Sequence, residues 1–140
     1  MEQEEKDLVL IDVCGRLPYD IKIKDEYGDC INVNIHNANI EHLIDRVVSG
    51  VDKMVLRPLS SMTEKEKDEF LHFFPFCRGD MYFDVKNACV EVFECPNKIT
   101  LYPFWDNVRL IDWLNKNMFD FRGLIPKGLA KAAPEGMYFT

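Results

Sequence analysis

The C-terminal segment, residues 117–140, most restricts the folds that this chain can adopt. It contains three Phe, one Tyr and two Met. Helix-breaking residues interrupt it at Gly123, Pro126, Gly128, Pro134 and Gly136. Disordered segments are poor in aromatic residues, and a helix does not accommodate so many Gly and Pro residues. We therefore predict that residues 119–129 are ordered, are not helical, and pack against the rest of the chain.

A predicted helix over residues 107–117 directly precedes this segment. Asp106 is placed to cap its start, because an Asp side chain accepts hydrogen bonds from the first free amides of a helix. Apolar residues at helical spacing predict its buried side. They are Val108, Ile111, Leu114 and Met118, with Leu110 and Trp113 widening the stripe. We expect the aromatic residues of the C-terminal segment to cover this side of the helix.

Alternating apolar and polar residues predict a β-hairpin near the N-terminus. Ile21 and Ile23 alternate with lysines, and Ile31, Val33 and Ile35 alternate with asparagines. This period of two is typical of strands that have one buried face and one solvated face. Residues 25–29, between the two strands, are acidic or Gly except for Tyr27, which fits a turn.

Other N-terminal segments leave the choice between helix and strand open. The apolar run Leu8–Ile11 fits a strand or the start of a helix. Residues 40–48 place their apolar side chains on one helical face, but the segment is short and rich in β-branched residues, so a strand remains an alternative. Residues 54–56 predict a further strand, which Pro58 ends.

The clearest local signal is a capping box at Thr63 and Glu66. In this motif the hydroxyl accepts from the third helical amide, and the carboxylate accepts from the amide of the cap residue. It predicts the start of a helix that continues to about Phe74, where Pro75 ends it. Alternating residues then predict a β-meander over residues 81–102.

Together these elements predict an α+β fold. Its expected parts are a small N-terminal β-unit, a capped middle helix, a β-meander and a C-terminal helix with an ordered, wrapping tail. The length of 140 residues and the hydrophobic content of 47% fit a single compact domain over residues 1–140. Within it, residues 8–59 and residues 60–140 are candidate sub-units.

Composition and charge restrict the classes of function. A net charge of −7 argues against general nucleic-acid binding, which needs a basic surface. The chain has no apolar run of membrane-spanning length and no signal peptide at its acidic start, so we expect a cytoplasmic protein that stays out of the membrane. Its Cys residues form no CxxC pair and its His residues are scattered, so we expect free thiols and no metal site. No catalytic motif is present, and we expect neither a cofactor nor enzymatic activity.

The best candidate for a binding site is the region around the C-terminal segment, where basic and aromatic residues are interleaved. The basic members are Lys116, Arg122 and Lys127, and the aromatic members are Trp113, Phe119 and Phe121. Such a segment suits a nucleotide or single-stranded nucleic acid, which it would hold by charge and by stacking. The structural alternative is that the Phe side chains fold back onto the core while the charged groups stay in solvent.

Several segments carry a resemblance to a known family. They are Arg16–Tyr19, Leu56–Glu66, Ile111–Asn117, Phe119–Ile125, Gly128–Ala130 and Ala133–Tyr138. Their order is similar to the pattern ARLPY, LRPLSSMTEEE, DWLN, FDxRGLI, GLA and APEGMY of small proteins from phages, prophages and mobile elements of Bacteroides-type gut bacteria. This chain departs from it at Gly15, where Ala is expected, and at Phe121, where Tyr or Ile is usual. The resemblance implies a cytoplasmic, phage-associated accessory protein whose N-terminal part is a small SH3-like barrel, and it supplies no catalytic residue.

Two classes of function follow from these observations. The first is a non-enzymatic accessory protein that binds a host or phage protein. The second is a binding module for a small ligand, a nucleotide or single-stranded nucleic acid, which would use the basic and aromatic C-terminal segment. The oligomeric state does not follow from the sequence.

Overall fold

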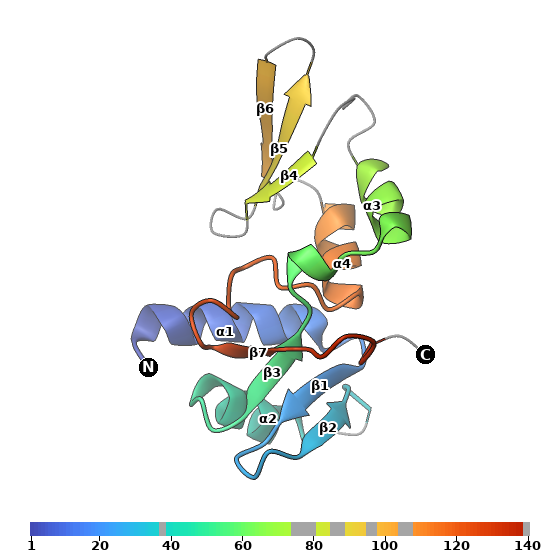
Figure 1. Cartoon of the computed structure of the whole chain (residues 1–140). Helices are drawn as coiled ribbons and strands as arrows, with labels where there is room; N and C mark the ends of the chain where they lie inside the picture. Colours follow the sequence, from blue (N-terminus) through green and yellow to red (C-terminus); the bar gives the residue numbers. More distant parts are fainter. Residues whose placement is uncertain (37–38, 74–80, 85–88, 95–97, 104–107, 139–140) are drawn as a thin grey trace.

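The computed structural model describes residues 1–36, 39–73, 81–84, 89–94, 98–103 and 108–138 (Figure 1). Helices and strands are mixed along these residues, which confirms the predicted α+β class. In chain order the elements are α1 (Gln3–Arg16), β1 (Ile21–Lys24), β2 (Cys30–Val33), α2 (Ile40–Val48), β3 (Lys53–Leu56), the 3₁₀ turn η1 (Leu59–Ser61), α3 (Glu64–Leu71), β4 (Met81–Asp84), β5 (Cys89–Glu94), β6 (Lys98–Pro103), α4 (Val108–Lys116) and β7 (Ala130–Ala132).

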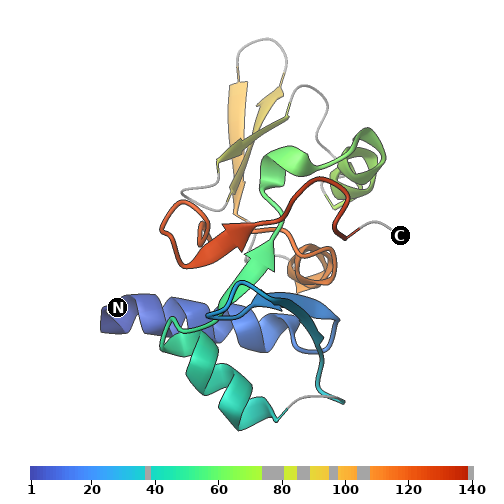
Figure 2. The same cartoon turned by 60° about the horizontal axis from the view of Figure 1, so that its bottom comes forward.

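The main sheet contains four strands in the order β2-β1-β3-β7. The strands β1, β2 and β3 are antiparallel neighbours, whereas β7 pairs in parallel with β3. Helices α1 and α2 pack together against one face of this sheet (Figures 1 and 2). The apolar residues of β1 point to that face, because Ile21 and Ile23 are 0% and 1% exposed.

The two N-terminal segments whose sequence fits either a helix or a strand are both helices. In α1, Val9 and Val13 are buried four residues apart, which is the spacing of one helical face. In α2, Leu43 and Val47 repeat this spacing, and the Asn39 side chain caps the helix by accepting from the amide of His42 (3.2 Å). The helix, and not the strand, is therefore the correct alternative for residues 40–48.

A second group of elements lies beyond the C-terminal end of β3 and contains η1, α3 and α4. The capping box is confirmed, since Thr63 and Glu66 bond each other reciprocally at the start of α3. The helix α3 ends at Leu71, earlier than predicted, and the expected end at Phe74 and Pro75 lies outside the described residues. The predicted cap Asp106 also lies outside them.

The buried side of α4 differs in one residue from the predicted stripe. Leu110 and Leu114 are fully buried, but Val108 is 83% exposed. The fully buried pair is spaced four residues apart and defines the inner face, so Val108, at the helix start, lies outside the cluster that the helix helps to form. The prediction of a buried Val108 is therefore wrong.

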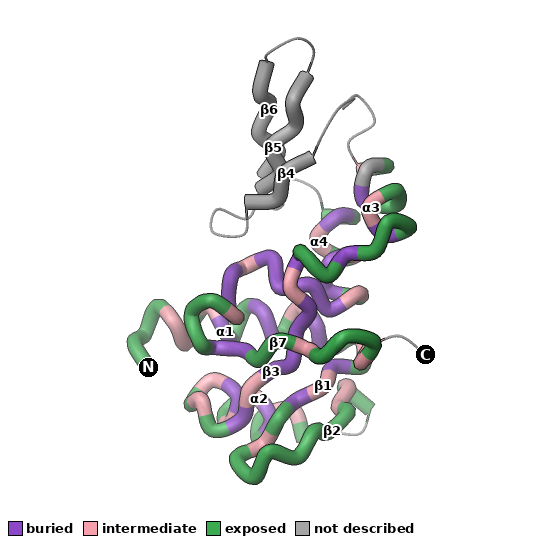
Figure 3. Tube along the Cα trace, viewed as in Figure 1, coloured by how far each residue is buried: buried purple, intermediate pink, exposed green. Residues whose placement is uncertain are grey.

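The C-terminal tail is ordered and wraps around the molecule, as predicted. Phe119, Phe121, Leu124 and Leu129 are all buried. The tail then enters the main sheet as β7, where Val55 of β3 is the partner of Lys131. Figure 3 shows the buried residues gathered in the middle of the molecule, where α1, β3, α4 and the tail meet.

The predicted β-meander is present as a three-stranded antiparallel sheet in the order β4-β5-β6. The main sheet, by contrast, ends at the edge strands β2 and β7, so its described strands form an open sheet and do not form an SH3-like barrel. Because β7 comes from the end of the chain, this sheet joins residues of both candidate sub-units, 8–59 and 60–140. No helix among the described residues combines the length and the apolar content that a membrane span needs.

Candidate functional site

Two adjoining clefts lie among the described residues. The first has a volume of about 610 Å³ and the second about 450 Å³, and both are open to solvent. Arg57, Met137 and Tyr138 line both of them, so we treat the two clefts as one groove. The other lining residues are Pro18, Tyr19, Asp20, Lys22, Asn32, Lys116, Asn117 and Met118 in the first cleft, and Pro58, Ser60, Ser61, Thr63, Ala133, Pro134, Glu135 and Gly136 in the second.

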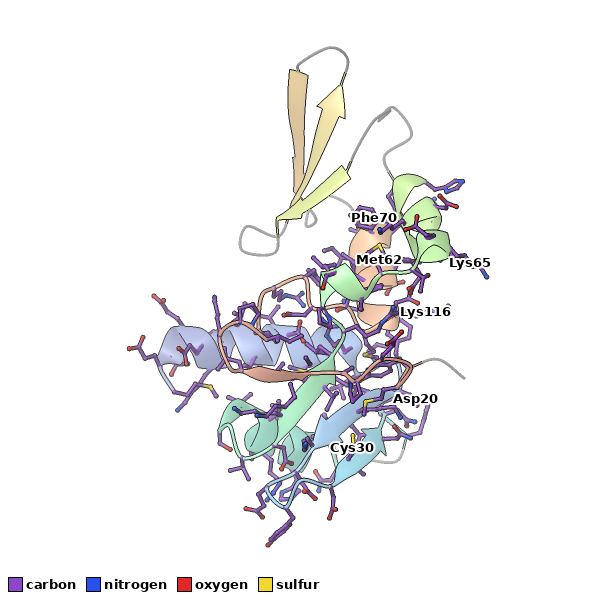
Figure 4. The ribbon with its side chains drawn as sticks, viewed as in Figure 1. Asp20, Cys30, Met62, Lys65, Phe70 and Lys116 are labelled. Carbon is purple, nitrogen blue, oxygen red and sulfur yellow. The ribbon has the colours of Figure 1, made fainter. Side chains whose placement is uncertain are left out.

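Four segments that are far apart in the sequence build this groove together with Asn32 of β2. They are residues 18–22, residues 57–63, residues 116–118 and residues 133–138. Figure 4 shows Asp20, which directly precedes β1, and Lys116, from the end of α4, on the same side of the molecule. The tail residues Met137 and Tyr138 belong to both clefts, so the docking of the tail determines the shape of the groove.

Arg57 holds the base of the groove in place. Its two terminal nitrogens each donate to one carboxylate oxygen of Glu66 at 2.7 Å, and its guanidinium lies 4.2 Å from the ring centroid of Phe119. Although burial opposes ionisation of Glu66, the bonds from Arg57 and from the amide of Thr63 keep the pKa of this carboxyl below its ordinary value. The paired carboxylate and the ring together fix Arg57 in a single orientation.

Tyr138 attaches the end of the tail to the main sheet. Its hydroxyl accepts from the backbone amide of Lys22 (3.2 Å) and donates to the backbone carbonyl of Val55. Lys22 and Val55 are cross-strand partners in β1 and β3, so the hydroxyl bridges the two strands. Burial raises the pKa of Tyr138 to about 12.

This raised pKa predicts a loss of stability at high pH. The unfolded chain loses the tyrosine proton near pH 10 and the folded chain near pH 12, so the contribution of Tyr138 is complete below pH 10 and is lost as the pH rises through 12. The difference corresponds to about 2–3 kcal/mol. Urea denaturation between pH 8 and pH 12 measures it. In Tyr138→Phe the decline should be smaller by this amount; an unchanged decline would assign it to other groups.

Charged and polar side chains surround the opening of the first cleft. Lys116 is exposed, and the Lys22 ammonium donates to Asn32 (2.6 Å) and lies 5.8 Å from the centroid of the Tyr138 ring. Asp20 supplies the opposite charge and accepts from Asn34 at 2.7 Å. The cleft therefore offers ammonium groups next to aromatic and thioether surfaces, a combination that suits a partner with both acidic and apolar groups.

Tyr19 fixes the wall of the groove nearest α4. Its hydroxyl donates to the carboxylate of Asp112 at 2.6 Å. This hydrogen bond, with burial and the negative charge of Asp112, raises the pKa of Tyr19 above its ordinary value. The bond ties the segment after α1 to α4 at one wall of the first cleft.

The aromatic residues predicted to bind a ligand lie in the core instead. Phe119 and Phe121 are 0% and 3% exposed. Trp113 is partly buried, stacks on Phe119 with ring centroids 5.6 Å apart, and donates from Nε1 to Glu69 (3.2 Å). The described structure therefore follows the structural alternative for the two Phe side chains, because buried rings present no face on which a base can stack.

The three predicted basic residues are not brought together. Arg122 forms an ion pair with Asp12 of α1 at 2.7 Å, and Lys127 is exposed on the turn before β7. Lys116 alone among them lines the groove. The basic and aromatic segment is thus divided between an internal ion pair, the core and the solvent.

Several groove residues were not among the sequence-based candidates, notably Tyr19, Lys22, Arg57, Met137 and Tyr138. Tyr19, Arg57, Met137 and Tyr138 lie in segments that are far apart in the sequence and meet at the groove. Lys22 had a sequence signal, because it occupies the solvated face of the predicted hairpin. The mutual proximity of these residues, however, arises only from tertiary packing.

Comparisons of the chain with protein-family models, with curated proteins and with solved structures returned no match. Within the residues that the structure describes, no group of three or more His, Cys, Asp and Glu side chains lies close enough to hold a metal ion. A functional assignment therefore rests on the groove and on the surfaces of this chain.

Proposed function

We propose that this protein is a non-enzymatic accessory protein that binds a segment of a partner protein in the groove. The observation that carries the proposal is the junction of the two clefts at Arg57, Met137 and Tyr138. An open, elongated surface suits a polypeptide segment better than a small molecule, since small-molecule sites bury most of their ligand. In line with the family resemblance, we propose a phage- or mobile-element-associated role in which the partner is a host or phage protein.

The rigidity of the groove supports this proposal. Its walls are held by bonds that already exist in the free protein, namely Arg57 to Glu66, Tyr19 to Asp112 and the Tyr138 bridge. A pre-formed surface loses little conformational freedom when a partner binds, and this favours affinity. The exposed ammonium of Lys116 at the rim would accelerate the approach of an acidic partner segment.

Reversal of the charge of Lys116 tests the proposal. Lys116→Glu should weaken partner binding at least about tenfold, which is about 1.4 kcal/mol, and should reduce its dependence on salt. Lys65→Glu is the matched control, because Lys65 is an exposed lysine of α3 that does not line the groove (Figure 4). The partner is first isolated by affinity capture from a bacterial lysate, and its dissociation constant is then measured by surface plasmon resonance for each variant.

Two outcomes would contradict the groove as the binding surface. In the first, the Lys116 and Lys65 variants bind the partner equally well. In the second, capture at native salt retains no protein in stoichiometric amount. A Ser60→Trp variant adds a steric test in the second cleft, where an exposed side chain on η1 is enlarged without a change of charge.

A further inference from the structure

Four lysines project from the face of the main sheet that α1 and α2 do not cover. Lys22 and Lys24 occupy β1, Lys53 lies in β3 and Lys131 lies in β7. In the register of the sheet, Lys22 is opposite Val55, Val55 is opposite Lys131, and Lys24 is opposite Lys53. Cross-strand partners share a face of the sheet, and so do residues two positions apart in one strand, such as Lys22 and Lys24. All four side chains therefore leave the sheet on the same side.

Three of these lysines line a separate pocket of about 280 Å³. Its lining residues are Lys24, Asp25, Glu26, Gly28, Val51, Lys53 and Lys131. None of them lines the groove. We name this cavity the lysine pocket, and it is distinct from the surface proposed above for a partner protein.

The lysine pocket contains an unfavourable pair of like charges. Lys24 and Lys53 are direct cross-strand partners, and like charges in that position destabilise a sheet. The ammonium of Lys53 donates to the carbonyl of Gly128 at 2.7 Å, which orients it without compensating its charge. Across the described part of the chain, neither these two ammonium groups nor that of Lys131 takes part in an ion pair.

The two carboxylates of the pocket are engaged elsewhere. Asp25 accepts from the amides of Tyr27 (3.0 Å) and Asp29 (2.8 Å) and thereby shapes the turn between β1 and β2. Glu26 accepts from Arg46 of α2 at 3.4 Å. The lysines consequently keep donors for a ligand, in a protein whose net charge is −7.

We propose that the lysine pocket binds the phosphate group of a phosphomonoester. Such a group carries a charge of about −1.5 to −2 and three strong acceptor oxygens, which matches a pocket lined by lysines from three strands. A carboxylate has a single charge and two acceptor oxygens, so it would interact more weakly with the three ammonium groups than a phosphate does. The volume of the pocket leaves room for the first atoms of the group that carries the phosphate.

Titration of the ¹⁵N-labelled protein with inorganic phosphate at constant ionic strength tests this proposal. The amide signals of Lys24, Gly28 and Lys131 should shift in a saturable manner, with a dissociation constant on the order of millimolar. In the double variant Lys24→Gln/Lys131→Gln the affinity should fall at least about tenfold. Shifts that grow linearly without saturation, as in general ionic screening, would overturn the proposal.

The matched control for charge is Lys65→Gln combined with Lys116→Gln, because this control also removes two positive charges. One of these lysines belongs to α3 and the other to the groove, so the control should bind phosphate within about twofold of the wild-type protein. An equal loss of affinity in this control would overturn the proposal, because binding would then depend on net charge alone. Urea denaturation should show the double variant to be at least as stable as the wild type, since the repulsion between Lys24 and Lys53 is removed.

A second titration identifies the source of the phosphate group. A nucleoside 5′-monophosphate that binds more tightly than inorganic phosphate shows that the pocket also holds the attached group. Equal affinity shows that the phosphate alone is recognised. Both results support the proposal provided that the binding is lost in the double variant, and binding that survives in that variant contradicts it.

Discussion

Replacement of Asp12 by Ala is expected to lower the free energy of unfolding by about 3–5 kcal/mol. Asp12 is fully buried and accepts three hydrogen bonds from two arginines. Its Oδ2 accepts from Nε of Arg16 at 2.7 Å, and its Oδ1 accepts from Arg16 (3.0 Å) and Arg122 (2.7 Å). Without the carboxylate, a fully buried guanidinium would keep its charge and lose its counter-ion, which is the costly way to break a buried ion pair.

The same cluster attaches α1 to the C-terminal tail, which explains why the effect should extend beyond one helix. A terminal nitrogen of Arg16 also donates to the carbonyl of Phe119 at 2.7 Å, and the Arg122 guanidinium lies 4.3 Å from the ring centroid of Phe121. Without Asp12, Arg16 and Arg122 would lose the carboxylate that holds both of them in place. The tail and α1 should therefore lose protection from amide exchange together.

Urea denaturation followed by circular dichroism measures this loss of stability. The matched control is Asp7→Ala, an exposed acidic residue of the same helix whose carboxylate accepts from Gln3 at 2.9 Å. This change should shift the free energy of unfolding by less than about 0.5 kcal/mol. A loss of less than about 1 kcal/mol in Asp12→Ala would show that Arg16 reaches solvent or a new partner when Asp12 is absent.

Elements with strong local signals could be predicted from the sequence. The start of α3 has two side chains, Thr63 and Glu66, that act within one turn, so no distant residue is needed to form the motif. The hairpin of β1 and β2 is marked by alternation on both strands and by an acidic turn. The buried face expected on its second strand is wrong, since Ile31 and Ile35 are 47% and 49% exposed on this edge of the sheet. The ordered tail also followed from the sequence, because buried aromatic side chains are the physical alternative to exposing them to water.

Elements that depend on distant partners could not be predicted. The helix α1 has no side-chain cap, and its four-residue apolar run fits a helix or a strand equally well until Val9 and Val13 meet the sheet. The strand β7 consists of Ala130, Lys131 and Ala132, a sequence with little preference for strands. It is a strand because β3 presents a free edge to it.

The candidate site likewise combines features that the local sequence predicts with features that only tertiary packing determines. The sequence places aromatic and basic residues next to one another in the tail, but it does not tell which face of the chain each side chain will take. Phe119 lies in the core, where its ring contacts the Arg57 guanidinium and stacks with Trp113. The lysines of the lysine pocket come together through the register of three strands, and one of these strands, β7, had no sequence signal.

Replacement of Arg57 by Ala is expected to destabilise the fold by about 3–5 kcal/mol. Glu66 would remain largely buried and would retain only the amide of Thr63 as a partner, and Phe119 would lose the cation above its ring. Glu66→Ala should also destabilise strongly, because it removes the same ion pair from the other side and one half of the capping box.

The double variant Arg57→Ala/Glu66→Ala decides how much of this effect belongs to the pair itself. If the bidentate ion pair dominates, the double variant should lose less stability than the sum of the single variants, with a coupling of about 1–3 kcal/mol. The coupling should decrease as the pH falls, because the pKa of Glu66 is held below its ordinary value and its stabilisation is lost when the carboxyl is protonated. Additive losses at pH 7 would instead assign the role of Arg57 to its contact with Phe119.

In either case Arg57 supports the fold as well as the groove. A loss of partner binding in Arg57→Ala alone therefore cannot locate the binding surface. Lys116→Glu can locate it, because Lys116 is an exposed residue at the rim of the groove.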